Sequence, residues 1–217
     1  MKSTISWGLA IGLILIAFGG TFLAYDNLPD KVPIHWNIRG QVDGYAPKSW
    51  GAWLLPGAMV LIFGLLSVLP KLLPSQLGIQ RFTHVYEFVV LLILGLFGCL
   101  QVLTIAQARD SKLNAGTWLA GIMYLFFALM GSVMGKIPRN PIMGIKVPWT
   151  LASDRVWSNA HRLAGWLWMA AGLLGLVFSL FGLTVVGVVL IGVAVIVPII
   201  TSYVDSRRGD GPGELPA

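Results

Sequence analysis

Charged residues are scarce in this chain of 217 residues, and so are the side chains that form disulfides or hold metal ions. Only 11% of the residues are Asp, Glu, Lys or Arg, and there are one cysteine and three histidines. The single cysteine, Cys99, excludes an internal disulfide framework and a cysteine-based metal site. No glycine-rich phosphate loop and no activated nucleophile is recognisable. We therefore predict no catalytic residue, no cofactor and no enzymatic activity.

Long uncharged apolar runs fill most of the chain, which is 56% hydrophobic with a mean hydropathy of +0.79. About 20 apolar residues in a helix cross the hydrocarbon of a bilayer, and such runs cover 5–24, 50–69, 88–108 and 115–135. A further run over 163–204 would reach roughly 63 Å as one helix, so it must fold back near 181–184. We predict an all-α integral membrane protein with six transmembrane helices in one bundle.

The distribution of positive charge predicts the orientation of the spans. With the N-terminus inside, ten of the fifteen Lys and Arg residues fall in inner segments and five in outer segments. Positive loops resist translocation, so we expect both termini and the 136–162 segment in the cytoplasm, and the 25–49 segment outside. The net charge of +6 forms no basic run, so we expect a lipid bilayer as partner and no direct nucleic acid.

Three regions are expected along the chain. Residues 1–110 form an N-terminal part with three spans and the outer loop. Residues 111–204 form a C-terminal part with the inner loop and three more spans, and 205–217 form a disordered polar tail. Gly8-x-x-x-Gly12 and Gly131-x-x-x-Gly135 fit close contacts between helices. Gln101 and Gln107 are polar interruptions of the third span.

The 136–162 segment is the densest group of polar and aromatic residues in the sequence. Pro138 and Pro141 prevent the fourth span from continuing, and Gly144 permits a backbone angle that other residues resist. Ser153 is predicted to be the N-cap of the next helix, with Asp154 in its first turn.

Helical spacing in the same segment predicts a common stripe of Trp157, His161 and Trp168. Two interpretations remain open. In one, Trp149, Trp157 and Trp166 anchor the chain at the headgroup level. In the other, Arg139, Lys146 and the tryptophans dock a partner protein, since Trp and Arg are enriched in protein contacts.

The 25–49 segment is predicted to be a turn-rich outer loop with at most short extended pieces. His35, Trp36 and Asn37 lie between a proline-containing turn and Gly40, with Asp43 following. This cluster is a candidate for recognition of a peptide, or for capping the helix bundle.

Metal binding is supported only weakly. His84-x-x-Glu87 places two possible ligands on one helix face, and His161 could join them, but the spacing matches no zinc-helix motif. Pairing of Glu87 with Arg81 or His84 at a helix boundary is the simpler interpretation.

Two other classes of function stay open beside the one considered next. A small transporter or lipid-handling protein would use Arg139, Lys146, Glu87 and His161 to line an inner vestibule. A metal-dependent membrane enzyme is the weaker alternative.

Two stretches together resemble the SdpI-like bacterial immunity proteins. LPDKVPIHWNIRGQVDGYAPK resembles a small domain of unknown function often found in their N-terminal part, and RNPIMGIKVPWTLASDRVWSNAHRLAG resembles their C-terminal signature. The resemblance implies a multipass protein of the bacterial cell membrane that protects the cell from a membrane-active toxin peptide outside. It also implies a candidate partner inside, a winged-helix transcriptional repressor held at the membrane for signal transduction.

The resemblance also assigns the candidate partner-binding or structural residues. In the inner segment they are Arg139, Asn140, Gly144, Lys146, Pro148, Trp149, Thr150, Trp157 and His161. In the outer segment they are Pro29, Pro33, His35, Trp36, Asn37, Gly40 and Asp43. Lys146 stands where the family more often has Arg, which keeps the charge but loses a bidentate guanidinium contact.

Overall fold

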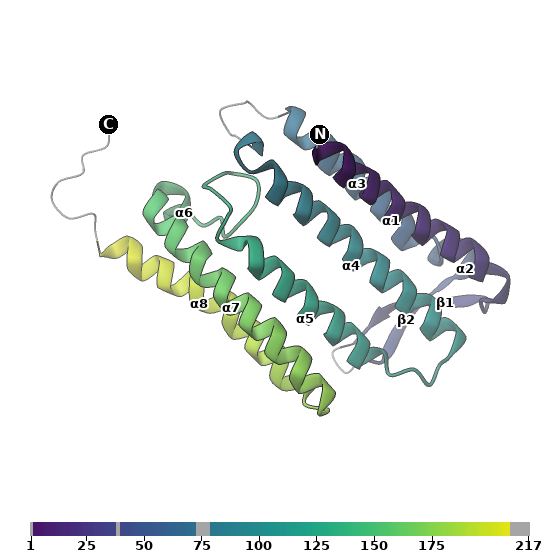
Figure 1. The fold of residues 1–217 in the computed structure, drawn as a ribbon. Coiled ribbons are helices and arrows are strands. Elements are labelled where there is room, and N and C mark those ends of the chain that lie inside the picture. Colours follow the sequence, from purple (N-terminus) through teal and green to yellow (C-terminus); the bar gives the residue numbers. More distant parts are fainter. Residues whose placement is uncertain (1, 38–39, 73–78, 209–217) are drawn as a thin grey trace.

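The computed structural model describes residues 2–37, 40–72 and 79–208, and most of these are helical (Figure 1). In chain order the elements are α1 (Lys2–Ala24), the 3-10 helix η1 (Tyr25–Asn27), β1 (Lys31–Trp36), β2 (Val42–Pro47), α2 (Lys48–Gly51), α3 (Leu54–Leu72), the 3-10 helix η3 (Ile79–Phe82), α4 (Thr83–Arg109), α5 (Ala115–Met134), α6 (Pro148–Ala152), α7 (Asp154–Leu180) and α8 (Thr184–Arg207). Within the described residues six helices are long and apolar enough to cross a membrane. The predicted six-helix fold is confirmed.

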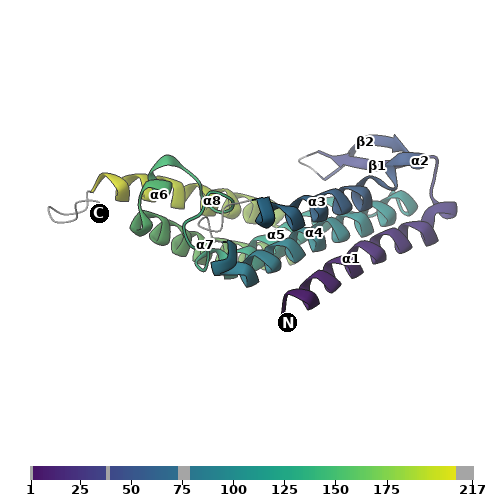
Figure 2. The same cartoon turned by 90° about the horizontal axis from the view of Figure 1, so that it is seen from above.

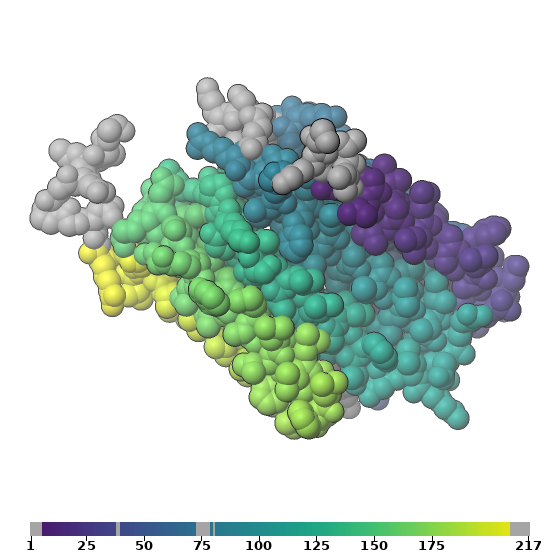
Figure 3. All heavy atoms as spheres, viewed as in Figure 1, coloured from purple at the N-terminus to yellow at the C-terminus, as the bar shows by residue number. Residues whose placement is uncertain are grey.

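The six long helices form two groups that meet at α4 and α5. α1 and α3 pack against α4, whereas α7 packs extensively against both α5 and α8. Figures 1 and 3 show the groups side by side as one continuous slab, with α1 in purple at one side and α7 in light green at the other. Large apolar side chains such as Ile16 and Leu61 are exposed on the outer faces of the helices, as expected for helices that contact lipid.

The elements outside the slab gather at its two ends. One end, which we call the hairpin end, contains β1, β2, the α4–α5 connection and the α7–α8 turn. The start of α1, the end of α8, η3 and the 136–162 segment lie at the other, the loop end (Figure 1). This grouping agrees with the predicted sequence of spans, while the side of the membrane that each end faces stays a prediction.

β1 and β2 form an antiparallel hairpin, so the 25–49 segment is more regular than the predicted turn-rich loop. Val32 pairs with Ala46 and Pro33 with Tyr45, followed by an irregularity near His35. The hairpin lies over the ends of α3 and α4, on the face away from α1 (Figure 2). Gly51 permits α2 to pack closely against the hairpin, because a Cβ there would lie 2.8 Å from both Ala46 Cβ and Val32 Cγ2.

Several element boundaries differ from the prediction. α3 continues past Pro70 to Leu72, α4 begins at Thr83 rather than 88, and α8 includes 205–207 of the expected disordered tail. Polar residues therefore form helical extensions at the loop end, where the helices leave the apolar region. The predicted disorder of 209–217 concerns residues outside those described. The predicted turn at 181–184 is confirmed, since α7 ends at Leu180 and α8 begins at Thr184.

Proline within these helices is accommodated by side chains of neighbouring helices. Proline lacks the N–H that would bond the carbonyl four residues earlier, and in an apolar region that carbonyl needs another donor. Tyr86 Oη donates to the Leu66 carbonyl at 2.7 Å, opposite Pro70. Trp168 Nε1 donates to the Ala194 carbonyl at 3.1 Å, opposite Pro198. Gln101 Nε2 likewise donates at 3.0 Å to the carbonyl of Ala52, four residues before Pro56. These bonds connect α3 to α4 and α7 to α8.

Only one of the two predicted glycine motifs makes a close helix contact. A Cβ at Gly131 would lie 2.5 Å from Met169 N and 2.7 Å from the Gly165 carbonyl, so α5 and α7 touch backbone to backbone. At Gly8 and Gly12 a Cβ would meet nothing within 4 Å. The prediction for α1 is therefore wrong within this chain, because α1 contacts α4 through other faces.

Candidate functional site

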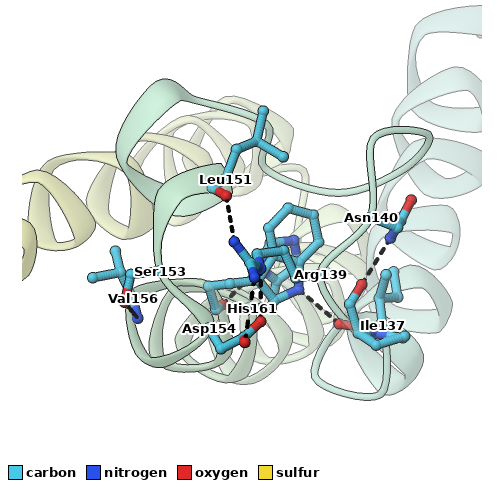
Figure 4. Close-up of polar contacts among 10 residues, drawn as sticks. Ile137, Arg139, Asn140, Leu151, Ser153, Asp154, Val156 and His161 are labelled. Carbon is cyan, nitrogen blue, oxygen red and sulfur yellow. Dashed lines mark hydrogen bonds and ion pairs between the residues drawn. The ribbon is translucent and has the colours of Figure 1, made fainter. Parts of the chain in front are cut away.

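The 136–162 segment folds back on α7 through bonds made by its polar side chains. Arg139 Nε and Nη2 donate to the two carboxylate oxygens of Asp154 at 2.7 and 3.4 Å, and Nη1 donates to the Leu151 carbonyl at 2.7 Å (Figure 4). Asn140 is buried and saturates its amide: Nδ2 donates to the Pro138 and Met143 carbonyls, while Oδ1 accepts two backbone N–H groups. Arg139 thus ties the loop to the start of α7, and Asn140 closes a tight turn.

A buried ring pair lies at the centre of the segment. The rings of Trp157 and His161 stack with centroids 4.0 Å apart and an interplanar angle of 16°. His161 Nε2 accepts the Ile145 N–H at 2.9 Å, which leaves the proton on Nδ1 to be donated to the Trp157 carbonyl at 2.8 Å. Trp157 Nε1 donates to the Ile137 carbonyl at 2.8 Å. Both ends of the loop are therefore bound to one face of α7.

Gly144 provides the space for this ring pair. Its φ is +121°, and a Cβ there would lie 2.3 Å from His161 Nε2 and 3.0 Å from Trp157 Cη2. The predicted need for glycine is therefore confirmed. It has two causes: the positive φ, and the closeness of the two rings, which leaves no room for a Cβ.

The rest of the signature shapes the entry to α6 and α7. Buried Thr150 accepts the Val147 N–H and donates to the Ile145 carbonyl at 2.6 Å. Lys146 Nζ donates to the Pro141 and Ile142 carbonyls. Pro148 is the first residue of α6, where its missing N–H costs nothing. Ser153 is the N-cap of α7, as predicted, and its hydroxyl accepts the Val156 N–H (Figure 4).

The four tryptophans considered in the sequence have different environments. Trp157 is 2% exposed, which rules it out both as a headgroup anchor and as a docking residue. Trp168 is partly buried and packs against the same core cluster, so the predicted stripe with Trp157 and His161 is partly realised. Trp149 bonds Ser202 Oγ at 2.9 Å and packs edge-on against Tyr203 in α8. Trp166, 65% exposed, is the one of the three proposed anchors that fits that role.

His84, Glu87 and His161 do not form a metal site. In the described parts of the chain no group of three His, Cys, Asp or Glu side chains could hold a metal ion. His161 uses both ring nitrogens for backbone bonds, as described above. Glu87 is 4% exposed, its Oε1 has no hydrogen-bond partner, and no ion pair joins it to Arg81 or His84 among the described residues. The predicted boundary pair is therefore wrong.

The proposed inner vestibule gains no support from these positions. Arg139 and Lys146 use their charged groups in bonds within the 136–162 segment. His161 packs beneath the same segment, 1% exposed. These three side chains hold the loop together.

At the hairpin end, the predicted outer residues hold the hairpin in shape. His35 Nδ1 and Asp43 Oδ1 lie 2.5 Å apart across the two strands. Asn37 Oδ1 accepts the Gln41 N–H at 3.1 Å, and Gly40 adopts a φ of +72° with its backbone against Gly116 of α5. Trp36 differs from these residues because its Nε1 is buried without a hydrogen-bond partner.

Two cavities lie beside the hairpin. One, of about 570 Å³, is lined by Pro29, Pro33, Gly40, residues of both strands and the α4–α5 connection. The other, of about 330 Å³, extends below Pro33 and Trp36 towards Leu100, Leu119 and Met123. Buried Gln107 and Thr104 of α4 line the first and second cavity respectively. Sequence reasoning missed this role, although two glutamines in an otherwise apolar span were visible as a signal.

The fold and the two ends together define the class: a multipass helical protein of the cell membrane with a β-hairpin at one end and a hydrogen-bonded loop at the other. Residues 136–202 match the SdpI/YfhL protein family, and residues 12–60 match DUF1648, a domain of unknown function. The resemblance to SdpI-like proteins is thus confirmed, in both segments and in the expected order.

One curated relative extends the similarity over most of the chain. It is "Immunity protein SdpI" of Bacillus subtilis (strain 168), 21% identical over 198 residues that make up 90% of this chain and 93% of the relative. No solved structure gives a significant match. The relative carries the name of an immunity protein and not of an enzyme.

Proposed function

We propose that this chain is a membrane immunity protein that protects a bacterial cell against a membrane-active toxin peptide. The observation that carries the proposal is the similarity to an immunity protein over 90% of the chain, with both family matches in place. The fold supports it, because a toxin that acts in the bilayer is accessible to a protein whose helices expose apolar surface to lipid. The hairpin end is the proposed outward face.

A signalling role is the second part of the proposal. The 136–162 segment would change or retain its packing with the state of the bundle, and its exposed face would hold a small winged-helix repressor at the membrane. Lys146, Pro148 and Leu151 are exposed on this face. The bonds from Arg139 to Asp154 and from the Ile145 N–H to His161 supply a rigid connection between that face and α7.

A survival assay tests protection directly. The chain is expressed in a bacterium that is sensitive to secreted membrane-active peptides, and survival is measured against a panel of such peptides. Protection against at least one peptide, absent with an empty vector and with a vector encoding an unrelated six-span protein, is the expected result. Unchanged killing by the whole panel, with the protein present in the membrane fraction, would contradict the proposal.

The repressor role needs a separate measurement. Fluorescently tagged winged-helix repressors encoded beside the gene are imaged in cells with and without the protein. Membrane localisation that depends on the protein is expected, and a diffuse repressor under both conditions would remove this part of the proposal while leaving protection intact.

A further inference from the structure

Three buried polar residues follow one side of α4 towards the hairpin: Gln101, Thr104 and Gln107, with 2%, 3% and 8% of their surfaces exposed. Each has a buried oxygen without a hydrogen-bond partner, namely Gln101 Oε1, Thr104 Oγ1 and Gln107 Oε1. Trp36 Nε1 of β1 is a fourth such atom. Because a buried polar atom without a partner destabilises the fold, a group of four near one hairpin indicates a function other than stability.

Gln101 differs from the other two because its amide group connects segments that are distant in the chain. Its Nε2 donates to Thr21 Oγ1 at 2.8 Å and to the Ala52 carbonyl at 3.0 Å, and so connects α1, α4 and the segment before α3. Gln107 Nε2 makes a longer bond of 3.3 Å to the Ser111 carbonyl, close in sequence. Thr104 has no hydrogen bond from its hydroxyl. The unexplained groups are therefore Gln107, Thr104 and Trp36.

All three unexplained side chains line the two cavities described above. Thr104 and Trp36 line the apolar cavity of about 330 Å³, and Gln107 lines the polar cavity of about 570 Å³. Pro33 borders both cavities, and Thr104 and Gln107 are three residues apart on one helix. The two cavities thus lie on either side of Pro33, and we call them together the hairpin cleft.

The chemistry of the hairpin cleft defines what it would bind. Trp36 Nε1 requires an acceptor, whereas Gln107 Oε1 requires a donor. Lys31 and Lys112 line the polar cavity, and neither ammonium group forms an ion pair among the described residues. The apolar cavity accepts hydrocarbon. A ligand that satisfies all of these groups combines an apolar part, a carbonyl, an N–H group and a negative charge.

We infer that the hairpin cleft binds an apolar peptide through its backbone and a carboxylate, most simply its C-terminus. The unpaired atoms of Trp36 and Gln107 are buried in this structure, so a peptide must displace neighbouring side chains to offer a carbonyl to Trp36 and an N–H to Gln107. Its apolar side chains would then fill the cavity beside Pro33, and its carboxylate would approach Lys31 and Lys112. A phospholipid offers phosphate and ester oxygens as acceptors. Only its headgroup could supply the hydrogen-bond donor that Gln107 requires. The peptide satisfies more of the unpaired groups.

This inference rests on the proposed function, because it names the surface where a toxin peptide would be held. Its test uses the full chain in nanodiscs of phosphatidylcholine. The probe is a mixture of N-acetylated hexapeptides of Ala, Val, Leu, Phe and Gly with free C-terminal carboxylates, and a matched mixture has C-terminal amides. Retained peptides are quantified by mass spectrometry for the wild-type chain and for each variant.

The informative variant is Gln107→Leu, with Gln101→Leu as its matched control on the same helix. Gln107→Leu removes an unpaired oxygen together with the long local bond to the Ser111 carbonyl, so the melting temperature is expected to change little. Retention of carboxylate peptides should fall roughly tenfold, the size expected for one unpaired ligand N–H. Gln101→Leu removes two bonds between segments, so it lowers the melting temperature. Thr104→Val is a second probe that changes shape little, and it is expected to reduce retention as well.

Each outcome decides a specific part of the inference. The inference is overturned if the wild type, Gln107→Leu and Thr104→Val all retain the same amount of carboxylate peptide. It is also overturned if the wild type retains no peptide. Equal retention of amide and carboxylate mixtures removes the role assigned to the lysines. If phosphatidylglycerol added to the nanodiscs displaces every peptide, and its binding depends on Gln107, the cleft is a lipid site and the peptide assignment is wrong.

The survival assay separates failure of the site from failure of the function. Protection that persists undiminished in Gln107→Leu and Thr104→Val leaves the immunity proposal standing and removes the cleft from it. Peptide retention that depends on Gln107, without protection against any toxin, leaves the cleft standing and removes immunity.

Discussion

Trp168 of α7 occupies the position that makes Pro198 tolerable in α8. The proline removes the N–H that would bond the Ala194 carbonyl, and Trp168 Nε1 donates to that carbonyl at 3.1 Å instead. A helix defect and a contact between helices are therefore parts of one feature, which specifies how α7 and α8 align.

This relationship predicts a non-additive pair of substitutions. Trp168→Phe leaves the Ala194 carbonyl without its donor and should lower the free energy of unfolding by about 1–3 kcal/mol. Pro198→Ala restores a backbone N–H, so Trp168→Phe should cost less in that background. A double-mutant cycle in detergent, followed by thermal unfolding, measures the coupling. Equal costs of Trp168→Phe in both backgrounds would show that the carbonyl is not shared in this way.

A second prediction concerns the ring pair beneath the signature loop. Gly144→Ala combines an unfavourable φ with a Cβ 2.3 Å from His161 Nε2, so we expect a loss of more than about 3 kcal/mol or failure to accumulate as folded protein. Gly182→Ala is the control, since Gly182 also has a positive φ of +74° but no atom within 4 Å of the added Cβ. It should cost only about 1–2 kcal/mol. Similar losses for the two variants, measured by detergent melting, would exclude the ring contact as the cause.

His161 itself provides a third prediction. His161→Phe keeps a ring for stacking but leaves the Ile145 N–H without its partner, at an expected cost of about 1–3 kcal/mol. His84→Phe is the control, because His84 is exposed and its replacement should change stability by less than about 0.5 kcal/mol. Limited proteolysis of the 136–162 segment should accelerate in His161→Phe alone. An unchanged rate of proteolysis would show that the hydrogen bonds of His161 do not hold the loop against α7.

The contact of α5 with α7 supports a fourth prediction. A methyl group at position 131 meets backbone atoms of α7 at 2.5–2.7 Å, so Gly131→Ala must separate the helices and should cost about 1–3 kcal/mol. Gly12→Ala adds the same methyl group where nothing lies within 4 Å, and should be neutral or slightly stabilising. Melting temperatures of the two variants in the same detergent test this difference. A destabilised Gly12→Ala would reveal a contact of α1 beyond this chain.

Orientation is the fifth prediction, and it depends only on the charge distribution. In a Cys99→Ala background, Lys31→Cys should react with a membrane-impermeant maleimide on intact cells, and Lys146→Cys only after permeabilisation. Both positions are exposed, so burial does not complicate the labelling. Labelling of Lys146→Cys on intact cells would reverse the topology and place the hairpin cleft inside.

Much of the fold could be predicted from the sequence, because the thickness of the hydrocarbon layer sets the length of each apolar run. The six helices, the turn at 181–184 and the N-cap at Ser153 were all predicted from local patterns. Boundaries at polar residues were predicted less well, as at Thr83 and Arg207, since nothing local distinguishes a helix that leaves the bilayer from a loop that begins there.

The candidate sites were predictable only in part. Gly144 was singled out by its backbone freedom and by family resemblance, and His161 by helical spacing and resemblance. The ring pair that explains both depends on residues brought together by folding. Gly8 and Gly131 look alike in sequence, and packing alone separates them. Trp157 looked like an interfacial anchor, and it is buried because the loop folds over it.

By itself, the sequence determined that this is a membrane protein of six apolar spans with two polar segments at opposite ends, because the cost of placing charge and unpaired backbone in hydrocarbon is local and large. Tertiary structure decided which polar groups are satisfied. Asn140, Thr150 and His161 find partners across the loop, whereas Gln107, Thr104 and Trp36 end beside cavities. Hydrogen-bond satisfaction depends on atoms distant in the chain, which no local pattern specifies.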